Sequence, residues 1–331
     1  MPSKIIIPVA SGKGGVGKTF LTANLAIAIA QKEHSTIVVD LDFGNSNLHT
    51  FLGLPNTIPG IGDFLRSQAK SLEPFQVKTE INNLEYIAGE GLMPLMADIT
   101  YNQKQKIIKE IGKLESDFIL LDLGAGCQND ILDLFGIVDR GIIVTTPEHP
   151  SVLSMLIFLK NYLLRKIDRL GNKDLNIIPI LQEIYNQPTD GPGRNIQVYR
   201  DKIAERSPEI AVEIDAICRM TRPRFIYNMG EHPRDLDTLP RIDNTLKSAF
   251  LLEGDHLGFV FYAPEVRASV RERRPFLLKY PESRTTKNIE QIATRITKAW
   301  DVDFLDSANR LREFTVEMHE KMVFEKKLHS P

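Results

Sequence analysis

The sequence predicts an α/β fold in which helices cover both faces of a doubly wound, mostly parallel β-sheet. Short apolar runs alternate with segments of helical periodicity along most of the 331 residues, and this alternation is typical of such sheets. A glycine-rich loop follows the first apolar run, and acidic residues close two of the later runs. Hydrophobic residues make up 42% of the chain, which is enough for a sizeable core.

Each predicted element is an apolar run or a periodic segment bounded by turn-forming residues. The helix expected at 18–31 is small and apolar on nearly all sides, so we expect it to be buried. The strand runs are apolar on both faces, as parallel strands between two layers of helices are. We expect strands at 4–10, 36–41, 84–87, 117–121, 141–145, 224–227 and 257–261, and further helices at 102–114 and 151–169.

One stretch, residues 171–222, departs from this alternation. It contains a short apolar run at 177–181, a turn-rich loop and one expected helix at 196–220. We interpret it as a helical insertion into a domain that spans residues 1–300. The alternative is that it belongs to the core and that the strand count is misplaced. Residues 301–331 are expected to form a helical extension.

Composition and charge limit the environment of the protein. The formal net charge is −2, so no global field draws the chain to nucleic acid or acidic lipid. Its two cysteines, Cys127 and Cys218, form no C-x-x-C pair and indicate a reducing compartment. The N-terminus lacks signal-peptide features, and no apolar run reaches the roughly 20 residues that span a bilayer. We therefore expect a cytoplasmic protein, with peripheral binding to a membrane or nucleoid left open.

The strongest motif is the loop at 12–19, which fits G-x-x-x-x-G-K-[ST] in full between a predicted strand and a predicted helix. Its glycines allow backbone N–H groups to turn inward on a phosphate chain, and the helix N-terminus adds partial positive charge. Lys18 is expected to reach the β- and γ-phosphates. The hydroxyl of Thr19 is expected to bind Mg²⁺.

Acidic residues stand at the ends of two predicted strands. Asp40 and Asp42 close the strand at 36–41, and strand alternation puts both on the same side. Asp122 follows the strand at 117–121, as the acid of a Walker B motif does. Doubly wound sheets bind ligands at the carboxyl ends of their strands. The sequence therefore predicts a Mg²⁺ site at this edge, with Asp122 holding the ion through water.

The loop from Lys13 to Thr19 resembles the deviant Walker A motif of the MinD/ParA superfamily of SIMIBI-class P-loop ATPases. The segments at 141–148 and 266–276 resemble its FlhG/MinD branch. This resemblance implies a P-loop NTPase fold and a dimer in which Lys13 crosses to the partner's nucleotide. It also implies that Asp42, in switch I, orients the attacking water, with Asp40 closer to the Mg²⁺ shell.

The same resemblance implies how a nucleotide is held. Asn228 follows a predicted strand and would read adenine with its amide, the alternative being a turn-forming asparagine. The strand that ends at Pro264 would form the other side of the base pocket. The implied catalytic residues are Lys13, Lys18 and Asp42, and the implied metal ligands are Thr19, Asp40 and Asp122. The implied nucleotide-binding residues are Gly12, Gly14, Gly15, Val16, Gly17, Lys18, Thr19, Phe20, Asn228 and Pro264.

Three features depart from the family pattern or leave alternatives open. Gly124 stands in switch II where relatives often have proline. The helix expected at 311–328 has mixed charge, which favours packing against a partner or its own domain over membrane binding. The arginines at 267, 271, 273 and 274 fit a solvated helix face better than a DNA contact.

These observations predict Mg²⁺-dependent ATP hydrolysis that drives an ATP-gated homodimer. The family implies spatial positioning of a division site, flagellum, chromosome or other cargo, together with a protein activator or cargo adaptor. A DNA or membrane surface is a further candidate partner. The alternative is a biosynthetic ATP-dependent ligase resembling amidoligases or dethiobiotin synthetase. Lys13 favours the dimer switch, and the full set of phosphate-binding residues disfavours an inactive adaptor.

Overall fold

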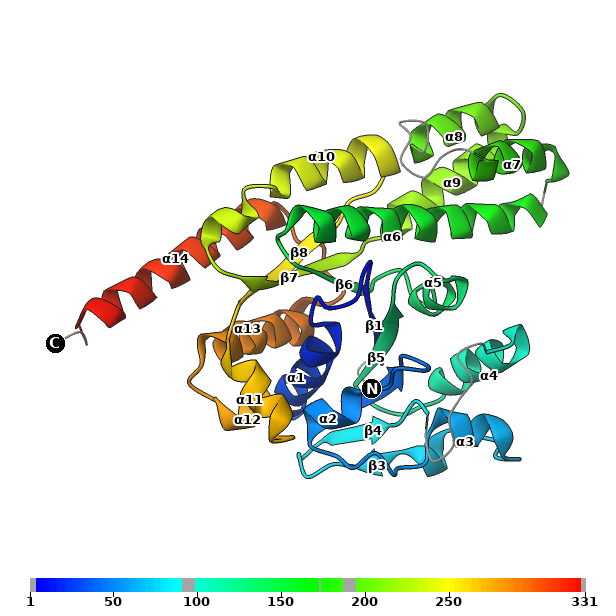
Figure 1. Cartoon of the computed structure of the whole chain (residues 1–331). Helices are drawn as coiled ribbons and strands as arrows, with labels where there is room; N and C mark the ends of the chain where they lie inside the picture. Colours follow the sequence, from blue (N-terminus) through cyan, green and yellow to red (C-terminus); the bar gives the residue numbers. More distant parts are fainter. Residues whose placement is uncertain (1–3, 91–98, 173, 187–194, 329–331) are drawn as a thin grey trace.

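A mostly parallel sheet with helices on both faces forms the centre of the molecule, as predicted (Figure 1). The computed structural model describes residues 4–90, 99–172, 174–186 and 195–328. Within them the sheet has eight strands in the order β3-β4-β2-β5-β1-β6-β7-β8. The strands are β1 Ile5–Ser11, β2 Thr36–Leu41, β3 Val77–Lys78, β4 Leu84–Ile87, β5 Phe118–Ala125, β6 Ile142–Thr145, β7 Arg224–Gly230 and β8 Asp255–Phe261.

Two hydrophobic cores lie on opposite faces of this sheet. Alternate residues of β5 show the division, because Leu120 belongs to one core and Ile119 to the other. The first core is closed mainly by α1 (Lys18–Ala30) and α13 (Arg284–Ala299), which lie side by side. The second is closed by α4 (Tyr101–Ile111), α5 (Asn129–Phe135), α6 (His149–Asp168) and α10 (Leu239–Phe250). Helix α1 is buried along its length, as its composition predicts.

Four strands differ clearly from the prediction. Strand β8 begins two residues early, and β7 continues to Gly230, so Asn228 lies inside it and does not follow it. Strand β3 has only two residues and pairs with β4 in the antiparallel direction, so it is too short to show a periodic pattern in the sequence. Strand β5 continues to Ala125, past the predicted end at 121. Asp122 therefore lies inside the strand, because the segment that follows it still pairs with the end of β1.

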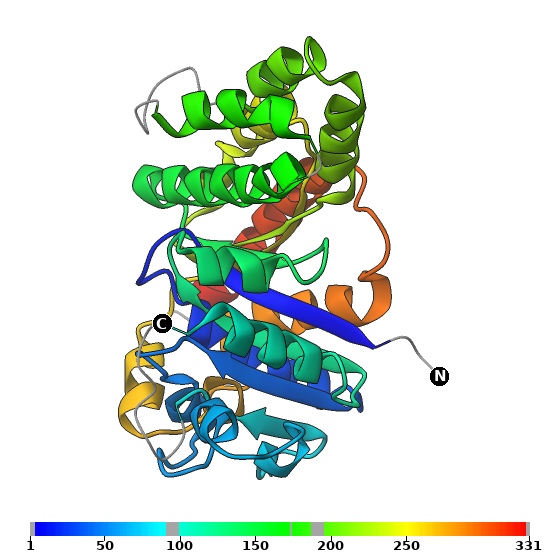
Figure 2. The same ribbon diagram turned by 90° about the vertical axis from the view of Figure 1, so that its right-hand side faces the viewer.

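The stretch 171–222 forms short helices packed around the end of α6 (Figure 2). The predicted helix at 196–220 is wrong as a single element. It is divided into α8 (Ile196–Ala204) and α9 (Pro208–Met220), because Pro208 occupies the first turn of α9 and Ser207 before it has a non-helical backbone. The apolar run at 177–181 lies in η3 (Leu175–Ile177) and α7 (Ile178–Asn186), after η2 (Arg169–Asn172). The turn-rich loop falls largely outside the described residues.

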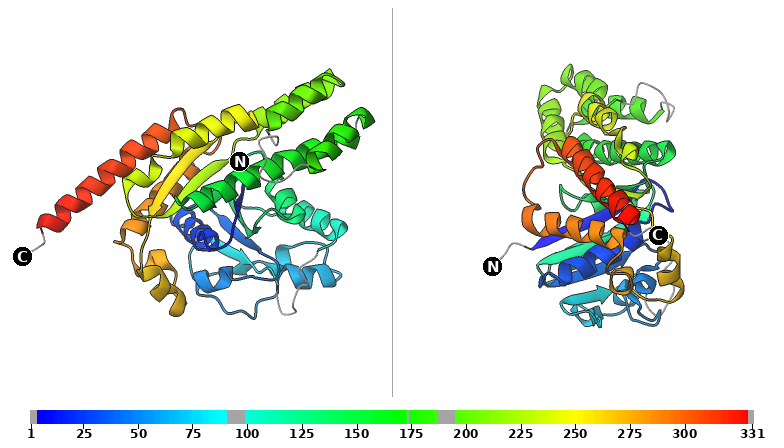
Figure 3. Two further views of the ribbon diagram at one scale, coloured as in Figure 1. Left: turned by 45° about the horizontal axis from the view of Figure 1, so that its top comes forward. Right: turned by 90° about the vertical axis from the view of Figure 1, so that its left-hand side faces the viewer.

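The C-terminal helix α14 (Ser307–Leu328) crosses β8 and then extends beyond the domain (Figure 3). Leu311 and Thr315 are buried on its inner face, so the first half packs against its own domain. In the part of the chain that the structure describes, none of the helices combines the length and apolar character needed to cross a membrane. The domain boundary at residue 300 stays a prediction.

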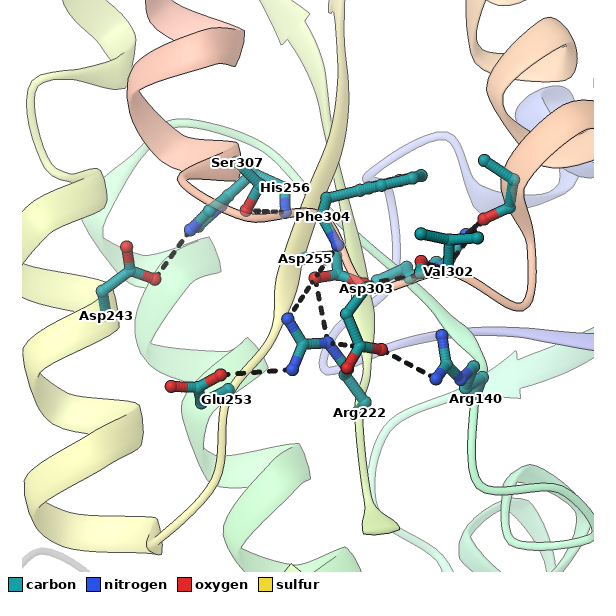
Figure 4. A network of polar contacts seen from close by, with 12 residues as sticks. Arg140, Arg222, Asp243, Glu253, Asp255, His256, Val302, Asp303, Phe304 and Ser307 are labelled. Atoms are coloured by element: carbon teal, nitrogen blue, oxygen red, sulfur yellow. Dashed lines mark hydrogen bonds and ion pairs between the residues drawn. The ribbon is translucent and has the colours of Figure 1, made fainter. Parts of the chain in front are cut away.

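An ion-pair network fixes the chain where α14 begins (Figure 4). Arg222 donates to Asp255 at 2.9 Å and pairs with Asp303 at 3.3 Å, and Asp303 also pairs with Arg140 at 2.7 Å. Arg224 is fully buried and donates to the carbonyl of Trp300 at 2.7 Å. These contacts join the starts of β7 and β8 to the segment that leads into α14.

The remaining elements are short and surround the carboxyl edge or the ends of the sheet. They are α2 (Leu48–Leu52), α3 (Ile61–Arg66), η1 (Glu73–Phe75), η4 (Pro233–Leu236), α11 (Glu265–Arg271) and α12 (Phe276–Lys279).

Candidate functional site

The glycine-rich loop lies between β1 and α1 at the carboxyl edge of the sheet, where the sequence places it. Gly17 immediately precedes α1 and has a φ of 81°. A residue with a side chain adopts this backbone angle only with strain. A Cβ at Gly12 would lie 2.1 Å from the backbone oxygen of Ser154 on α6. Backbone geometry therefore requires glycine at both positions, and α6 supports the loop from behind.

We expect Gly12→Ala to destabilise the protein by about 2 kcal/mol or more, because the new methyl group meets backbone atoms of α6 that have no rotamer to change. Gly14→Ala is the matched control, since a Cβ there meets no atom within 4 Å. Urea unfolding monitored by circular dichroism measures both. Equal stability of the two variants would contradict the close approach of loop and helix.

The ammonium group of Lys18 lies among carboxylates beside this loop. Its Nζ atom is 2.8 Å from Oδ1 of Asp122 and 3.9 Å from Oδ2 of Asp42. The hydroxyl of Thr22, one turn further along α1, is 2.9 Å from the same Oδ1 atom of Asp122. Asp40 and Asp122 face each other across the pairing of β2 with β5. The structure thus brings four predicted site residues together, with Thr22 as an addition.

The donor set at this point fits a Mg²⁺ ion. The Oδ2 atom of Asp122 is buried and accepts no hydrogen bond from any described residue, which is costly unless a cation or water meets it. Thr19 is half-buried at the start of α1 with its hydroxyl 3.5 Å from Lys18 Nζ. No group of three or more His, Cys, Asp and Glu among the described residues could hold a metal alone. Mg²⁺ suits such a site because it keeps several waters and shares phosphate oxygens.

Asp40 has a role that sequence reasoning missed, because it fastens the loop that follows β2. Its carboxylate accepts hydrogen bonds from Ser46 Oγ at 2.6 Å, Leu48 N at 3.2 Å and Asp42 N at 3.1 Å. Burial, followed by the charge of Asp122, raises the pKa of Asp40 to about 7. The Mg²⁺ role of Asp40 stays a prediction, and the hydrogen bonds show that it holds the loop predicted as switch I.

Asp42 lies just beyond β2, with about a fifth of its side chain exposed. Burial raises the pKa of Asp42, and the nearby Lys18 opposes that rise. A Cβ at Gly124 would lie 3.3 Å from Asp42 Oδ1, so the two segments predicted as switch I and switch II are in contact. Glycine at 124 leaves the room that this contact needs.

A largely apolar cavity of about 640 Å³ opens on the other side of the loop. Phe20, Phe51 and Phe261 form part of its wall. Asn228, at the carboxyl end of β7, also lines it, and its Nδ2 atom donates to Val16 O at 2.8 Å. Pro264 caps α11, and its chain neighbour Ala263 lines the cavity. The base-reading role of Asn228 stays a prediction, since its amide nitrogen already contacts the loop.

Two of the arginines expected on a solvated helix face also border this cavity. Arg267 and Arg271 are exposed, one turn apart on α11, and both border the cavity. In the sequence, the only sign of this was that Arg267 and Arg271 stand four residues apart, soon after a predicted strand. Nothing in the sequence indicated that Phe51 and Phe261 line a cavity, because an apolar residue in a short helix or a strand is normally part of the hydrophobic core.

Lys13 takes no part in these hydrogen bonds and ion pairs. It is exposed in the turn of the loop, and in the described parts of the chain no side chain or backbone group forms a hydrogen bond or ion pair with its ammonium. Its contact with the nucleotide of a second copy, which the resemblance implies, stays a prediction.

A family model for ParA, described as the NUBPL iron-transfer P-loop NTPase, matches residues 3–207. The chain belongs to this family of P-loop NTPases. Among curated proteins, it is 33% identical over 148 residues to the septum site-determining protein MinD of Thermotoga maritima, covering 44% of this chain and 54% of that protein. It is 32% identical over 151 residues to MinD of Helicobacter pylori, covering 45% and 55%. The chain spans about half the length of these ParA-family relatives.

Solved structures of the ParA family extend the similarity of fold to most of the chain. The MinC:MinD cell division protein complex of Aquifex aeolicus aligns with a TM-score of 0.57 at 19% identity, covering 92% of this chain and 99% of that one. MinD complexed with Mg-ADP from Pyrococcus horikoshii gives 0.57 at 20% identity, covering 90% and 98%. The predicted family and the predicted doubly wound sheet are confirmed.

Proposed function

We propose that this protein binds ATP with Mg²⁺ and hydrolyses it, and that the cycle opens and closes a homodimer. The observation that carries the proposal is the convergence of Lys18, Asp42 and Asp122 beside a glycine-rich loop at the carboxyl edge of the sheet. Asp122 offers a buried oxygen without a partner among the described residues, which suits the coordination shell of a phosphate-bound cation.

Each residue has a defined task in this proposal. Lys18 binds the β- and γ-phosphates, and the N–H groups at the start of α1 support them. Thr19 and Asp122 hold Mg²⁺, which when bound neutralises charge on the phosphate oxygens. Asp42 orients the water that attacks the γ-phosphate, and Asp40 fixes the loop that carries Asp42. The aromatic wall of the neighbouring cavity provides apolar surface for a purine.

The dimer and the biological role rest on Lys13 and on the relatives. An exposed lysine in the phosphate loop can neutralise charge on a nucleotide held by a second copy. The curated relatives are septum site-determining proteins, and one structural neighbour is a complex of MinC with MinD. We propose a role in positioning a large cargo, with a protein activator or adaptor, in the cytoplasm or peripherally at a membrane or nucleoid surface. The ParA-family match favours this role over a biosynthetic ligase.

Calorimetry with ATP tests the proposed binding. We expect saturable binding of one ATP per chain in the presence of Mg²⁺, and weakening of at least about tenfold when EDTA removes the ion. Slow release of phosphate under the same conditions would support hydrolysis. If the folded wild-type protein binds no ATP at millimolar concentration with Mg²⁺ present, the proposed function is wrong.

A further inference from the structure

The carboxylate of Asp122 is held on one oxygen by two donors from the same helix. Lys18 Nζ and Thr22 Oγ1 lie 2.8 Å and 2.9 Å from Oδ1, and both side chains come from the first turns of α1. The other oxygen, Oδ2, has no hydrogen-bond partner among the described residues. Both Thr22 and Asp122 are fully buried. The direction in which Oδ2 points is therefore set by what binds Oδ1.

The two donors differ in what else they can do. In the proposed function Lys18 also binds the β- and γ-phosphates, so its ammonium is shared between Asp122 and the nucleotide. Thr22 faces no such competition, because among the described residues its hydroxyl forms hydrogen bonds only with Asp122, at 2.9 Å, and with the carbonyl of Lys18, at 3.0 Å. A hydroxyl donates more strongly to a carboxylate than to a neutral carbonyl. Thr22 is thus the donor to Asp122 that a bound phosphate would not compete for.

We propose that Thr22, which lies outside the phosphate-loop motif, is a positioning residue that orients Asp122 for Mg²⁺ while Lys18 is engaged with the nucleotide. This inference rests on the proposed function and adds a residue to it. A donor that fixes a metal-binding carboxylate from behind typically changes metal affinity by ten- to a hundredfold when it is removed. Thr22 therefore acts on Mg²⁺ affinity, with a smaller effect on the stability of the empty protein, where Lys18 still pairs with Asp122.

Three variants separate positioning from packing. Thr22→Val keeps the shape of the side chain and removes the hydroxyl, whereas Thr22→Ser keeps the hydroxyl and removes a methyl group. Thr36→Val is the matched control, because Thr36 is also buried but lies at the opposite end of β2, where its hydroxyl donates to His34 O. Each full-length variant is titrated with Mg²⁺ in the presence of a fluorescent ADP, and its thermal unfolding is recorded without nucleotide.

We expect Thr22→Val to need about tenfold more Mg²⁺ for half-maximal enhancement of ADP binding, while its ADP affinity in EDTA and its melting temperature stay close to those of the wild type. Thr22→Ser should restore the Mg²⁺ requirement to within about threefold, and Thr36→Val should leave it unchanged. The proposal is overturned if Thr22→Val responds to Mg²⁺ as the wild type does. It is equally overturned if Thr22→Ser and Thr22→Val are impaired alike.

The same titration separates this inference from the proposed function. A wild-type protein that binds Mg²⁺ and ADP, combined with a fully responsive Thr22→Val variant, rejects the role of Thr22 and retains the nucleotide site. A wild-type protein that binds no nucleotide rejects both.

Discussion

If Asp42 orients the attacking water, replacing it with alanine should lower ATP turnover by about 100-fold or more. The affinity for Mg-ATP should stay within about threefold of the wild-type value. The side chain lies beyond the end of β2, partly exposed, 3.9 Å from Lys18 and against Gly124. It therefore lies beside Lys18, where we propose that the phosphates bind, and outside the hydrophobic cores. Phosphate release measures turnover, and calorimetry measures binding.

The same variant should change the oligomeric state, because hydrolysis is the step that opens the proposed dimer. We expect Asp42→Ala to sediment as a dimer with ATP and as a monomer with ADP. Asp301→Ala is the control, since Asp301 is exposed in a turn far along the chain and pairs with no described residue. An Asp42→Ala protein that binds ATP and remains monomeric at saturation would reject the ATP-gated dimer.

The parts of the site that the sequence predicted are those formed by neighbouring residues. The loop from Gly12 to Thr19 carries its own turn chemistry, and the strand before it and the helix after it are apolar enough to be recognised without tertiary information. The acids at 40 and 42 follow one strand. Local pattern therefore fixes where the phosphates are expected to lie.

Two of the contacts that were missed join residues far apart in the chain. Thr22 meets Asp122 across 100 positions, and Asn228 meets Val16 across 212. The sequence shows only that Thr22 places a hydroxyl on a buried helix. Nothing in it indicates that this hydroxyl lies beside Asp122. The resemblance proposed Asn228, but only the fold shows that its amide contacts the phosphate loop.

Two features that the sequence shows locally were nevertheless interpreted wrongly or missed. The pair Ser207-Pro208 marks a helix start, yet the apolar periodicity from 196 to 220 favoured one continuous helix. The hydrogen bond from Ser46 to Asp40 was equally local, six residues apart. It was missed because an acidic residue near a phosphate-binding loop suggests a metal ligand. A carboxylate that holds the following loop by hydrogen bonds is a less obvious interpretation.

Replacing Lys13 with alanine is expected to abolish the dimer while leaving each subunit folded and able to bind ATP. The ammonium of Lys13 is exposed and forms no hydrogen bond or ion pair with any described residue, so the melting temperature of the variant should stay within about 1 °C of the wild-type value. In the proposed dimer this ammonium neutralises phosphate charge on the nucleotide of the second copy. Its loss should therefore weaken dimerisation with ATP by about 100-fold.

The decisive comparison places this change in the background of the slow-hydrolysing variant. Asp42→Ala alone should be dimeric with ATP, and Lys13→Ala with Asp42→Ala should be monomeric at the same concentration, because hydrolysis then contributes to neither result. Lys32→Ala is the matched control: Lys32 is exposed beyond the far end of α1, so the substitution removes the same charge far from the loop. A dimer that persists without Lys13 would show that the second lysine of the motif serves its own subunit, and the interface would have to be sought elsewhere on the surface.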